Sequence, residues 1–270
     1  MGYMLRNTDK RRDPRLLMPG ARSVIALVLA YKSDRLVQGI AQYAYGEDYH
    51  ERMKRMMWNL IATIKALWAD CGGGDNDGAT LTARPFVDTA PISDRHWAVQ
   101  AGLGWIGSNT LFLHRRYGSF CFLGEIVTTA SFDVYDRPLD QLTGPCVDCR
   151  LCVDACPNGA ICCASSGAPM VDARRCTSYN TIENRATALP AALQRRGYVY
   201  GCDICQAVCP LNSNAPAAYT LTEERKRELE MLRDADEATF SKVTKHTAME
   251  RIKYAQWRRN LGTTRQEGCS

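Results

Sequence analysis

Hydrophobic positions in the first half of the chain follow the spacings of strands and helices in turn. An unbroken apolar run over 23–31 (SVIALVLAY) predicts a buried strand. Residues 48–70 carry apolar side chains at i, i+3 and i+4 intervals and end at a glycine cluster, which predicts a helix packed through its methionines and aromatics. Further elements are predicted at 83–87 (strand), 93–101 (helix, with Ser93 as its cap) and 120–128 (strand).

Strands that alternate with helices predict an α/β layer in this part of the chain. Ligands of such layers tend to lie beyond the carboxyl ends of the strands. Asp88 directly follows the predicted strand 83–87 and is therefore a candidate functional residue. The alternative is an aspartate that caps a helix or closes a turn.

Composition limits the class of protein. The chain is 46% apolar and 23% charged, which is typical of folded domains and not of disordered chains. Its longest apolar run, 24–30, is far shorter than the roughly 20 residues of a membrane-spanning helix. Residues 1–15 lack the apolar stretch of a secretory signal. We therefore expect a cytoplasmic protein that does not cross a membrane.

Cysteine is unusually frequent, with 13 in 270 residues. Disulfides rarely persist in a reducing compartment and an odd number cannot all pair, so these thiols are expected to bind metal. The first run reads C-x2-C-x2-C-x3-C-P and the second C-x2-C-x3-C-P, as in two-cluster ferredoxins. A single cysteine between the runs completes a set of eight: Cys146, Cys149, Cys152, Cys156, Cys176, Cys202, Cys205 and Cys209.

Eight thiolates are enough for two [4Fe–4S] clusters. In two-cluster ferredoxins the last cysteine of a run binds the other cluster. That rule predicts one cluster on Cys146, Cys149, Cys152 and Cys209, and the other on Cys156, Cys176, Cys202 and Cys205. Zinc is the alternative, but it closes with four ligands and does not require the crossed arrangement. The remaining cysteines have no such spacing and are expected to be ordinary side chains: Cys71, Cys121, Cys162, Cys163 and Cys269.

The cluster segment occupies only a quarter of the chain, about 144–212, so the part in front of it is expected to carry the chemistry. We predict an α/β catalytic domain over 1–143, a ferredoxin-like domain over 144–215 and a basic helical segment over 216–270. A glycine-rich stretch, 101–110, suits a backbone that lies against a large flat ligand. It matches G-x-G-x-x-G, but a helix rather than a strand precedes it, so a nicotinamide site is not expected.

Taken together, these motifs resemble the epoxyqueuosine reductases of tRNA modification. DTAP, AGLGWIG and YGCDICQ are more specific to that family than the cysteine runs are. The matching segments follow the family order over nearly the whole chain: 10–23, 43–50, 87–91, 101–107, 118–125, both cysteine runs, 172–179 and 200–206.

The resemblance implies a cobalamin enzyme that uses two [4Fe–4S] clusters to reduce epoxyqueuosine to queuosine at the wobble position of tRNA. Asp88 matches the family's acid, which protonates the departing oxygen. Cobalamin contacts carry over to Arg11, Asp88, Phe112, Leu123, Ser178, Cys202 and Asp203. For Arg11 the alternative is a solvated basic residue, and for Phe112 and Leu123 it is plain core.

The resemblance also implies partners: tRNA carrying epoxyqueuosine and an external electron donor of the ferredoxin or flavodoxin type. We expect a monomer. Residues 241–265 carry seven Lys or Arg against one acid, Glu250, so they could contact phosphates. Tyr254 and Trp257 could stack on an unpaired base there, or they could pack a solvated basic helix.

Two departures from the family pattern stand out. Ser108 occupies the position where the family commonly has lysine, and members usually carry a few dozen residues before the point where this chain begins. Both place activity in doubt more than fold. The alternatives are a related corrinoid reductase, similar to reductive dehalogenases, an electron carrier with a noncatalytic front domain, and a family member that no longer turns over. The chain lacks a twin-arginine export signal and carries VDTAP, which disfavours the dehalogenase alternative.

Overall fold

The computed structural model describes residues 7–71, 81–139, 146 and 148–262. The chain forms two compact units that do not follow chain order. The first comprises 1–29, 50–105 and 122–142, and the second 30–49, 106–121 and 143–270. One border between the units lies at 142/143, one residue before the expected division, and 30–49 and 106–121 belong with the residues after that border.

A three-stranded sheet organises the first unit, in the order β1 (Ser23–Ala30), β5 (Cys121–Thr128), β2 (Ala83–Phe86). These are the strands that the sequence predicts. β2 and β5 are antiparallel, with Phe86 opposite Glu125. Bonds from Arg22 N to Thr128 O (2.9 Å) and from Tyr31 N to Phe120 O (2.8 Å) give β1 and β5 opposite directions as well. The rule for ligands of parallel sheets, which drew attention to Asp88, therefore does not apply here.

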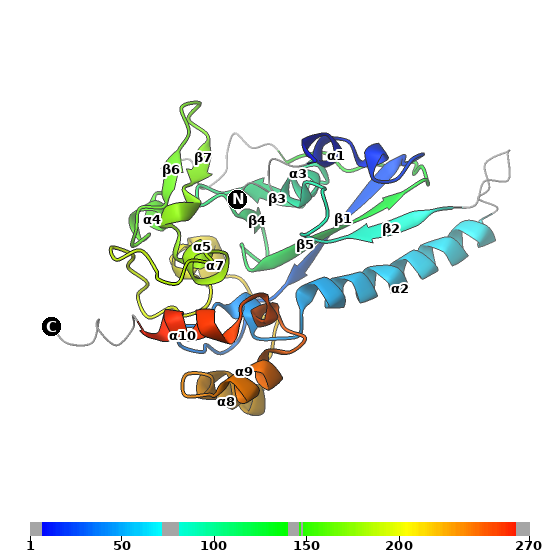
Figure 1. Ribbon diagram of the computed structural model, residues 1–270. Helices are drawn as coiled ribbons and strands as arrows, with labels where there is room; N and C mark the ends of the chain where they lie inside the picture. The colour runs from blue at the N-terminus through cyan, green and yellow to red at the C-terminus, as the bar shows by residue number, and fades with distance from the viewer. Residues whose placement is uncertain (1–6, 72–80, 140–145, 147, 263–270) are drawn as a thin grey trace. The chain divides into compact units, whose positions relative to one another are not determined.

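Helices and loops of the same unit cover both faces of this sheet (Figure 1). On one face lies α2 (Tyr49–Asp70), whose buried Met53 and Met57 lie so close to Gly124 of β5 that a side chain there would collide with them. On the other face, Phe86 and Val127 pack with Met18, Ile92 and Trp97. Trp97 belongs to α3 (Asp94–Gln100); Ser93 is its N-cap residue, but the expected side-chain cap hydrogen bond is not formed.

Short elements complete the front half of the chain. They are α1 (Thr8–Arg12), η2 (Pro14–Leu16), η3 (Gln42–Ala44), β3 (Gly104–Ile106) and β4 (Phe112–His114).

The cluster segment of the second unit consists of short elements joined by turns. They are α4 (Leu151–Asp154), the antiparallel pair β6 (Ile161–Cys163) and β7 (Pro169–Val171), η5 (Ala173–Arg175), α5 (Thr177–Ile182), α6 (Ile204–Ala207) and α7 (Pro210–Ser213). After them come α8 (Glu223–Met231), α9 (Glu237–Thr244), η6 (Ala248–Arg251) and α10 (Tyr254–Gly262).

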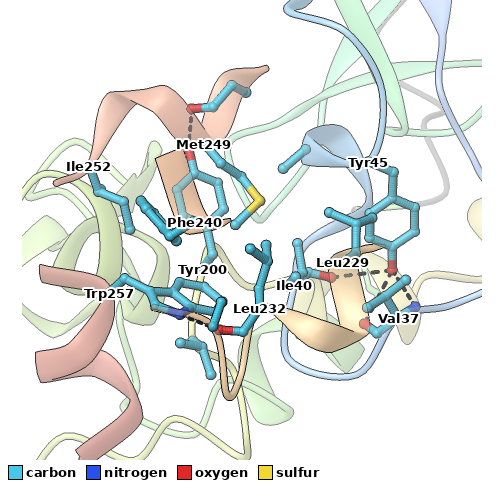
Figure 2. Packing of buried hydrophobic residues seen from close by; sticks show 14 of the residues in the cluster. Val37, Ile40, Tyr45, Tyr200, Leu229, Leu232, Phe240, Met249, Ile252 and Trp257 are labelled. Atoms are coloured by element: carbon cyan, nitrogen blue, oxygen red, sulfur yellow. Dashed lines mark hydrogen bonds between the residues drawn. The ribbon is translucent and has the colours of Figure 1, made fainter. Parts of the chain in front are cut away.

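The C-terminal helices enclose the main apolar core of this unit (Figure 2). Trp257 is 1% exposed, and its indole Nε1 donates to Leu232 O at 2.8 Å. The hydroxyl of Tyr254 donates to Ala235 O at 2.9 Å, and its ring lies against Phe240. The base-stacking expectation for Trp257 is therefore wrong, because its ring is enclosed by its own unit. Of the helices described here, none is both long enough and apolar enough to cross a membrane.

Candidate active site

Asp88 lies two residues beyond the end of β2, with a left-handed backbone (φ 41°) that non-glycine residues seldom adopt. Its side chain is 57% exposed. One carboxylate oxygen, Oδ2, lies 3.1 Å from Nε2 of His50 in the first turn of α2. This contact orients the carboxyl group of Asp88.

A second acid lies beside Asp88. The backbone amide of Asp88 hydrogen-bonds to the carboxyl group of Asp94, the first residue of α3. Burial raises the pKa of Asp94 to about 6, and the negative charge of Asp88 contributes in the same direction. The loop that carries Asp88 is thus anchored to the start of a helix.

Three buried N–H donors of the first unit have no hydrogen-bond partner among the described residues. They are Nε of Arg11 in α1, Nε1 of Trp97 in α3 and Nε1 of Trp105 in β3. The Arg11 guanidinium makes one long bond, from Nη1 to Ile92 O at 3.4 Å. Buried donors without partners are rare in folded proteins, and a bound group with acceptor oxygens would satisfy donors of this kind.

The eight cysteines, seven in the two runs and Cys176 between them, are free thiols in this structure. Electrostatic interactions between them fall into two sets. Cys152 interacts with Cys146, Cys149 and Cys209, whereas Cys202 interacts with Cys176 and Cys156. Cys205 interacts mainly with the second set, and also with Cys152. The crossing rule assigns each of these sets to one cluster, and that assignment stays a prediction.

Burial makes two of these thiols, Cys202 and Cys205, hard to ionise without a metal. It raises the pKa of Cys202 to about 12 and that of Cys205 further still, with neighbouring thiols adding to both shifts. Thiolates at such positions need the positive charge of bound iron. Within the described residues, no three His, Cys, Asp or Glu side chains converge closely enough for a single metal ion. Thiolates around a cubic cluster each bind a different iron and so lie farther apart than the ligands of one zinc, which makes the donor set suited to clusters.

Polar side chains buried beside the second cysteine run form a connected network. Asp203 Oδ2 accepts from Gln42 N at 2.8 Å, and its Oδ1 accepts from Gln206 Nε2 at 3.3 Å. Ser119 Oγ donates to Gln206 Oε1 at 3.0 Å and accepts from Asn212 Nδ2 at 2.9 Å. Burial raises the pKa of Asp203 to about 6. The network holds the helix that carries Cys205 in place.

The predicted cobalamin contacts are divided between the units. Arg11, Asp88 and Leu123 belong to the first, and Phe112, Ser178, Cys202 and Asp203 to the second. Phe112 is 5% exposed, as expected of core. Leu123 is partly accessible and, two positions before Glu125, shares the β5 face that carries that residue.

Packing within the chain explains two glycines of the glycine-rich stretch. A Cβ at Gly102, where φ is 67°, would lie 2.5 Å from Arg137 O, and one at Gly107 would lie 2.5 Å from Leu113 Cδ1. These glycines are needed whether or not a ligand is bound. Ser108, at the position of the family lysine, has its hydroxyl 3.3 Å from the carbonyl oxygen of Cys146.

Sequence reasoning missed three residues around Asp88: His50, Asp94 and Glu125. The available signals were weak. His50 ends the segment 43–50, and Glu125 is an acid inside an otherwise apolar strand. No periodicity connects residues that are tens of positions apart.

Comparison with known proteins gives consistent matches. Residues 11–89 match the family described as epoxyqueuosine reductase QueG, DUF1730, and residues 145–212 match a 4Fe-4S double cluster binding domain. The chain is 37% identical to an epoxyqueuosine reductase of Cyclobacterium marinum, over 99% of this chain and 84% of that protein. It is 39% identical to one of Synechocystis sp., over 93% of this chain and 86% of that protein.

Solved structures show the same likeness. An epoxyqueuosine reductase from Streptococcus thermophilus superposes with a TM-score of 0.80 at 26% identity, covering 95% of this chain and 67% of that one. A second such enzyme, solved with an epoxyqueuosine-modified tRNA stem loop, gives a TM-score of 0.74 at 28% identity, covering 93% of this chain and 66% of that one.

Proposed function

This chain belongs to the epoxyqueuosine reductase family, and from that premise we propose that it reduces epoxyqueuosine in tRNA to queuosine. The relatives carry that activity in their names, and one structural neighbour was solved with the modified stem loop. The cofactors are two [4Fe–4S] clusters and cobalamin.

Removal of the epoxide oxygen breaks two C–O bonds, consumes two electrons and two protons, and yields an alkene and water. When bound, the clusters deliver electrons one at a time and cobalamin supplies the reducing cobalt centre. The protein must bind the tRNA base, hold both cofactors and provide protons where the oxygen departs.

Asp88 provides the proton in this proposal. His50 holds its Oδ2 at 3.1 Å, so the carboxyl group is presented in a defined direction at the end of β2. A related structure from Bacillus subtilis is described with its catalytic aspartate loop swung out of the active site.

The residues present fit both cofactors. Each of the two sets of four cysteines described above would supply the ligands of one cluster. The unpartnered donors of Arg11 and Trp105 suit the amide oxygens at the edge of a corrin ring. The wider set of contacts, with Phe112, Leu123, Ser178, Cys202 and Asp203, remains a prediction.

One observation carries the proposal: an aspartate oriented by a histidine stands at the position of the family's acid. The test is to purify the chain without oxygen and load it with cobalamin. Loaded protein is then incubated with epoxyqueuosine tRNA and a strong reductant, and the nucleosides are analysed by mass. We expect wild type to form queuosine and Asp88→Asn to be slower by about 10²–10⁴-fold.

The matched control is Asp70→Asn, the same chemical change at the exposed end of α2. It should leave the rate unchanged. If wild type binds iron and corrin but leaves epoxyqueuosine unchanged, the proposed substrate is wrong. Ser108→Lys, which introduces the family residue, is then the first variant to test. Equal rates for Asp88→Asn and wild type would contradict the role of Asp88 as the proton donor.

Two further expectations belong to this proposal. Because clusters accept single electrons, the external donor should be of the ferredoxin or flavodoxin class. The chain is expected to act as a monomer, which light scattering at working concentration measures.

A further inference from the structure

Glu125 lies in the middle of β5 and has no exposed surface. Neither of its carboxyl oxygens has a hydrogen-bond partner among the described residues. An ionised carboxylate in such a place would cost several kcal/mol. A fully buried acid in a strand that could hold leucine or valine therefore calls for an explanation.

The surroundings of Glu125 are apolar except on one side. Phe86 is its partner on β2, and on that face of the sheet Phe86 packs with Ile92 and Trp97. From α3, the carboxyl group of Asp94 faces it, and Asp94 is the only residue whose charge acts on Glu125 in the described structure. One Asp94 oxygen, Oδ1, is also buried without a partner. Asp88 in turn interacts with Asp94 through its amide and its charge.

Two carboxylates can only accept hydrogen bonds. The Asp88 amide donates to Asp94, but both Glu125 oxygens and Asp94 Oδ1 have no donor, so a proton held between the two groups is favoured. Burial, and then the charge of Asp94, raises the pKa of Glu125 well above its usual value. The Asp94 pKa rises less, to about 6, because a proton held by Glu125 would be donated to the Asp94 carboxylate and so stabilise its ionised form. Glu125 is thus the proton donor within the pair.

We propose that Asp94 and Glu125 share one proton and form the store from which Asp88 is reprotonated during turnover. The proposal rests on the proposed function, whose reaction takes up two protons with its two electrons as the oxygen leaves as water. Asp88 can hold only one proton. The Asp94 carboxyl, bonded to the Asp88 amide, is placed to return the other to the exposed Asp88 side chain. Asp94 and Glu125 act through Asp88 and are positioning residues.

The first test does not depend on turnover. Infrared difference spectra of the holoenzyme, labelled with ¹³C-glutamate, report a protonated carboxyl as a C=O band. The measurement is made at about pH 8, where Asp94 and Asp203, each with a pKa of about 6, are ionised. We expect a label-sensitive band in wild type and in Asp88→Asn, and none in Glu125→Gln. Absence of the band from wild type would overturn the shared proton.

The second test measures the pH profile of queuosine formation. Glu125→Gln keeps the shape of the side chain but holds no acid proton. We expect about a 10-fold loss of kcat, a high-pH limb moved to lower pH, and little change in KM for the tRNA. Asp94→Glu retains a carboxyl pair and should recover most of the rate. A Glu125→Gln enzyme with the wild-type profile would overturn the role of the pair.

Folding and function failures remain distinguishable. Iron content and corrin binding report whether Glu125→Gln has folded. If Glu125→Gln does not fold, Asp94→Asn is used instead. Because that variant removes the negative charge facing Glu125, the glutamate band should disappear at a lower pH than in wild type. An unchanged pH would contradict the carboxyl pair. Wild type that shows the band but forms no queuosine overturns the proposed function and leaves the shared proton established.

Discussion

At the scale of single residues, the site depends on the orientation of one aspartate. The left-handed backbone of Asp88 costs about 1 kcal/mol, which neighbouring contacts must offset. His50 and Asp94 supply such contacts, one to the side chain and one to the amide. A catalytic acid held from both ends in this way needs little rearrangement before it donates its proton.

Replacement of His50 should therefore impair the reaction without abolishing it. His50→Ala removes the group that lies 3.1 Å from Asp88 Oδ2, and we expect about a 10-fold lower kcat. His50→Gln retains an N–H donor and should keep most of the rate. The measurement is queuosine formation at saturating tRNA, with iron content as a check on folding. Equal losses in both variants would argue against an orienting hydrogen bond.

The buried acids also predict how stability changes with pH. Glu125 and Asp94 have raised pKa values in the folded protein, so the folded chain binds more protons than the unfolded one. Stability therefore falls as pH rises from the unfolded values near 4 toward the folded ones. Asp94, shifted from 3.8 to about 6, accounts for at most about 3 kcal/mol of this loss.

Glu125→Gln should flatten that dependence, which urea unfolding of the holoenzyme at a series of pH values measures. Asp236 provides a control of opposite sign. It caps α9, and hydrogen bonds from Thr239 lower its pKa, so its contribution is lost as pH falls. Asp236→Ala should reduce stability only above about pH 4. A steep fall that persists in Glu125→Gln would mean that other groups cause it.

At the scale of elements, close packing explains residues that a pattern of apolar positions passes over. Gly118 precedes β5 with φ 61°, and a Cβ there would lie 1.8 Å from Asn212 Oδ1. That same oxygen accepts a hydrogen bond from Ser119 N at 2.7 Å. The turn and the helix that begins after Cys209 are therefore fitted to each other through a glycine.

Gly118→Ala should be strongly destabilising. It adds left-handed strain of about 1–2 kcal/mol and displaces the buried Asn212, for a total of about 3 kcal/mol or more. Gly167→Ala is the matched control, because φ there is 81° but no atom lies within 4 Å of the added Cβ. It should cost only about 1 kcal/mol. The urea midpoints of the two variants measure the difference, and similar midpoints would contradict the packing argument.

At the scale of the whole molecule, we predict that each cysteine run contributes a ligand to the cluster of the other run. Cys146 and Cys209 both interact with Cys152, which predicts that they bind the same cluster although they are far apart in sequence. Cys146→Ser, Cys209→Ser and the double variant should each lose one cluster, leaving about four irons of about eight. Cys146→Ser combined with Cys176→Ser should lose both.

Iron analysis and electron paramagnetic resonance of the reduced protein check this assignment. If the double variant Cys146→Ser and Cys209→Ser loses both clusters, the two cysteines serve different clusters and the crossing rule does not hold here. Cys163→Ser, at an exposed thiol outside both groups, is the control and should retain all the iron.

The double-cluster domain and the strands of the sheet could be predicted from sequence because both depend on local patterns. Cysteines three residues apart bind a cluster wherever the segment lies, and a continuous apolar run forms a strand in most settings. The strand over 23–31 and the helix over 48–70 are found within a residue of the predicted bounds. Whether neighbouring strands are parallel or antiparallel could not be predicted from these local patterns, because strand pairing joins residues far apart in the chain.

The sequence by itself determined the double-cluster domain, the main elements and, through its motifs, the family. Only the tertiary structure decided which groups surround Asp88 and which aromatics are buried. Trp257 has the same spacing from basic residues in either interpretation, and its burial against Leu232 O excludes base stacking. Glu125 and Asp94 are 31 positions apart and belong to different elements, so only the packing of α3 on the sheet makes them a carboxyl pair. A metal-binding motif is visible in the spacing of residues along the chain. The pKa of a buried acid depends instead on the exclusion of water and on the charged groups that the fold places beside it.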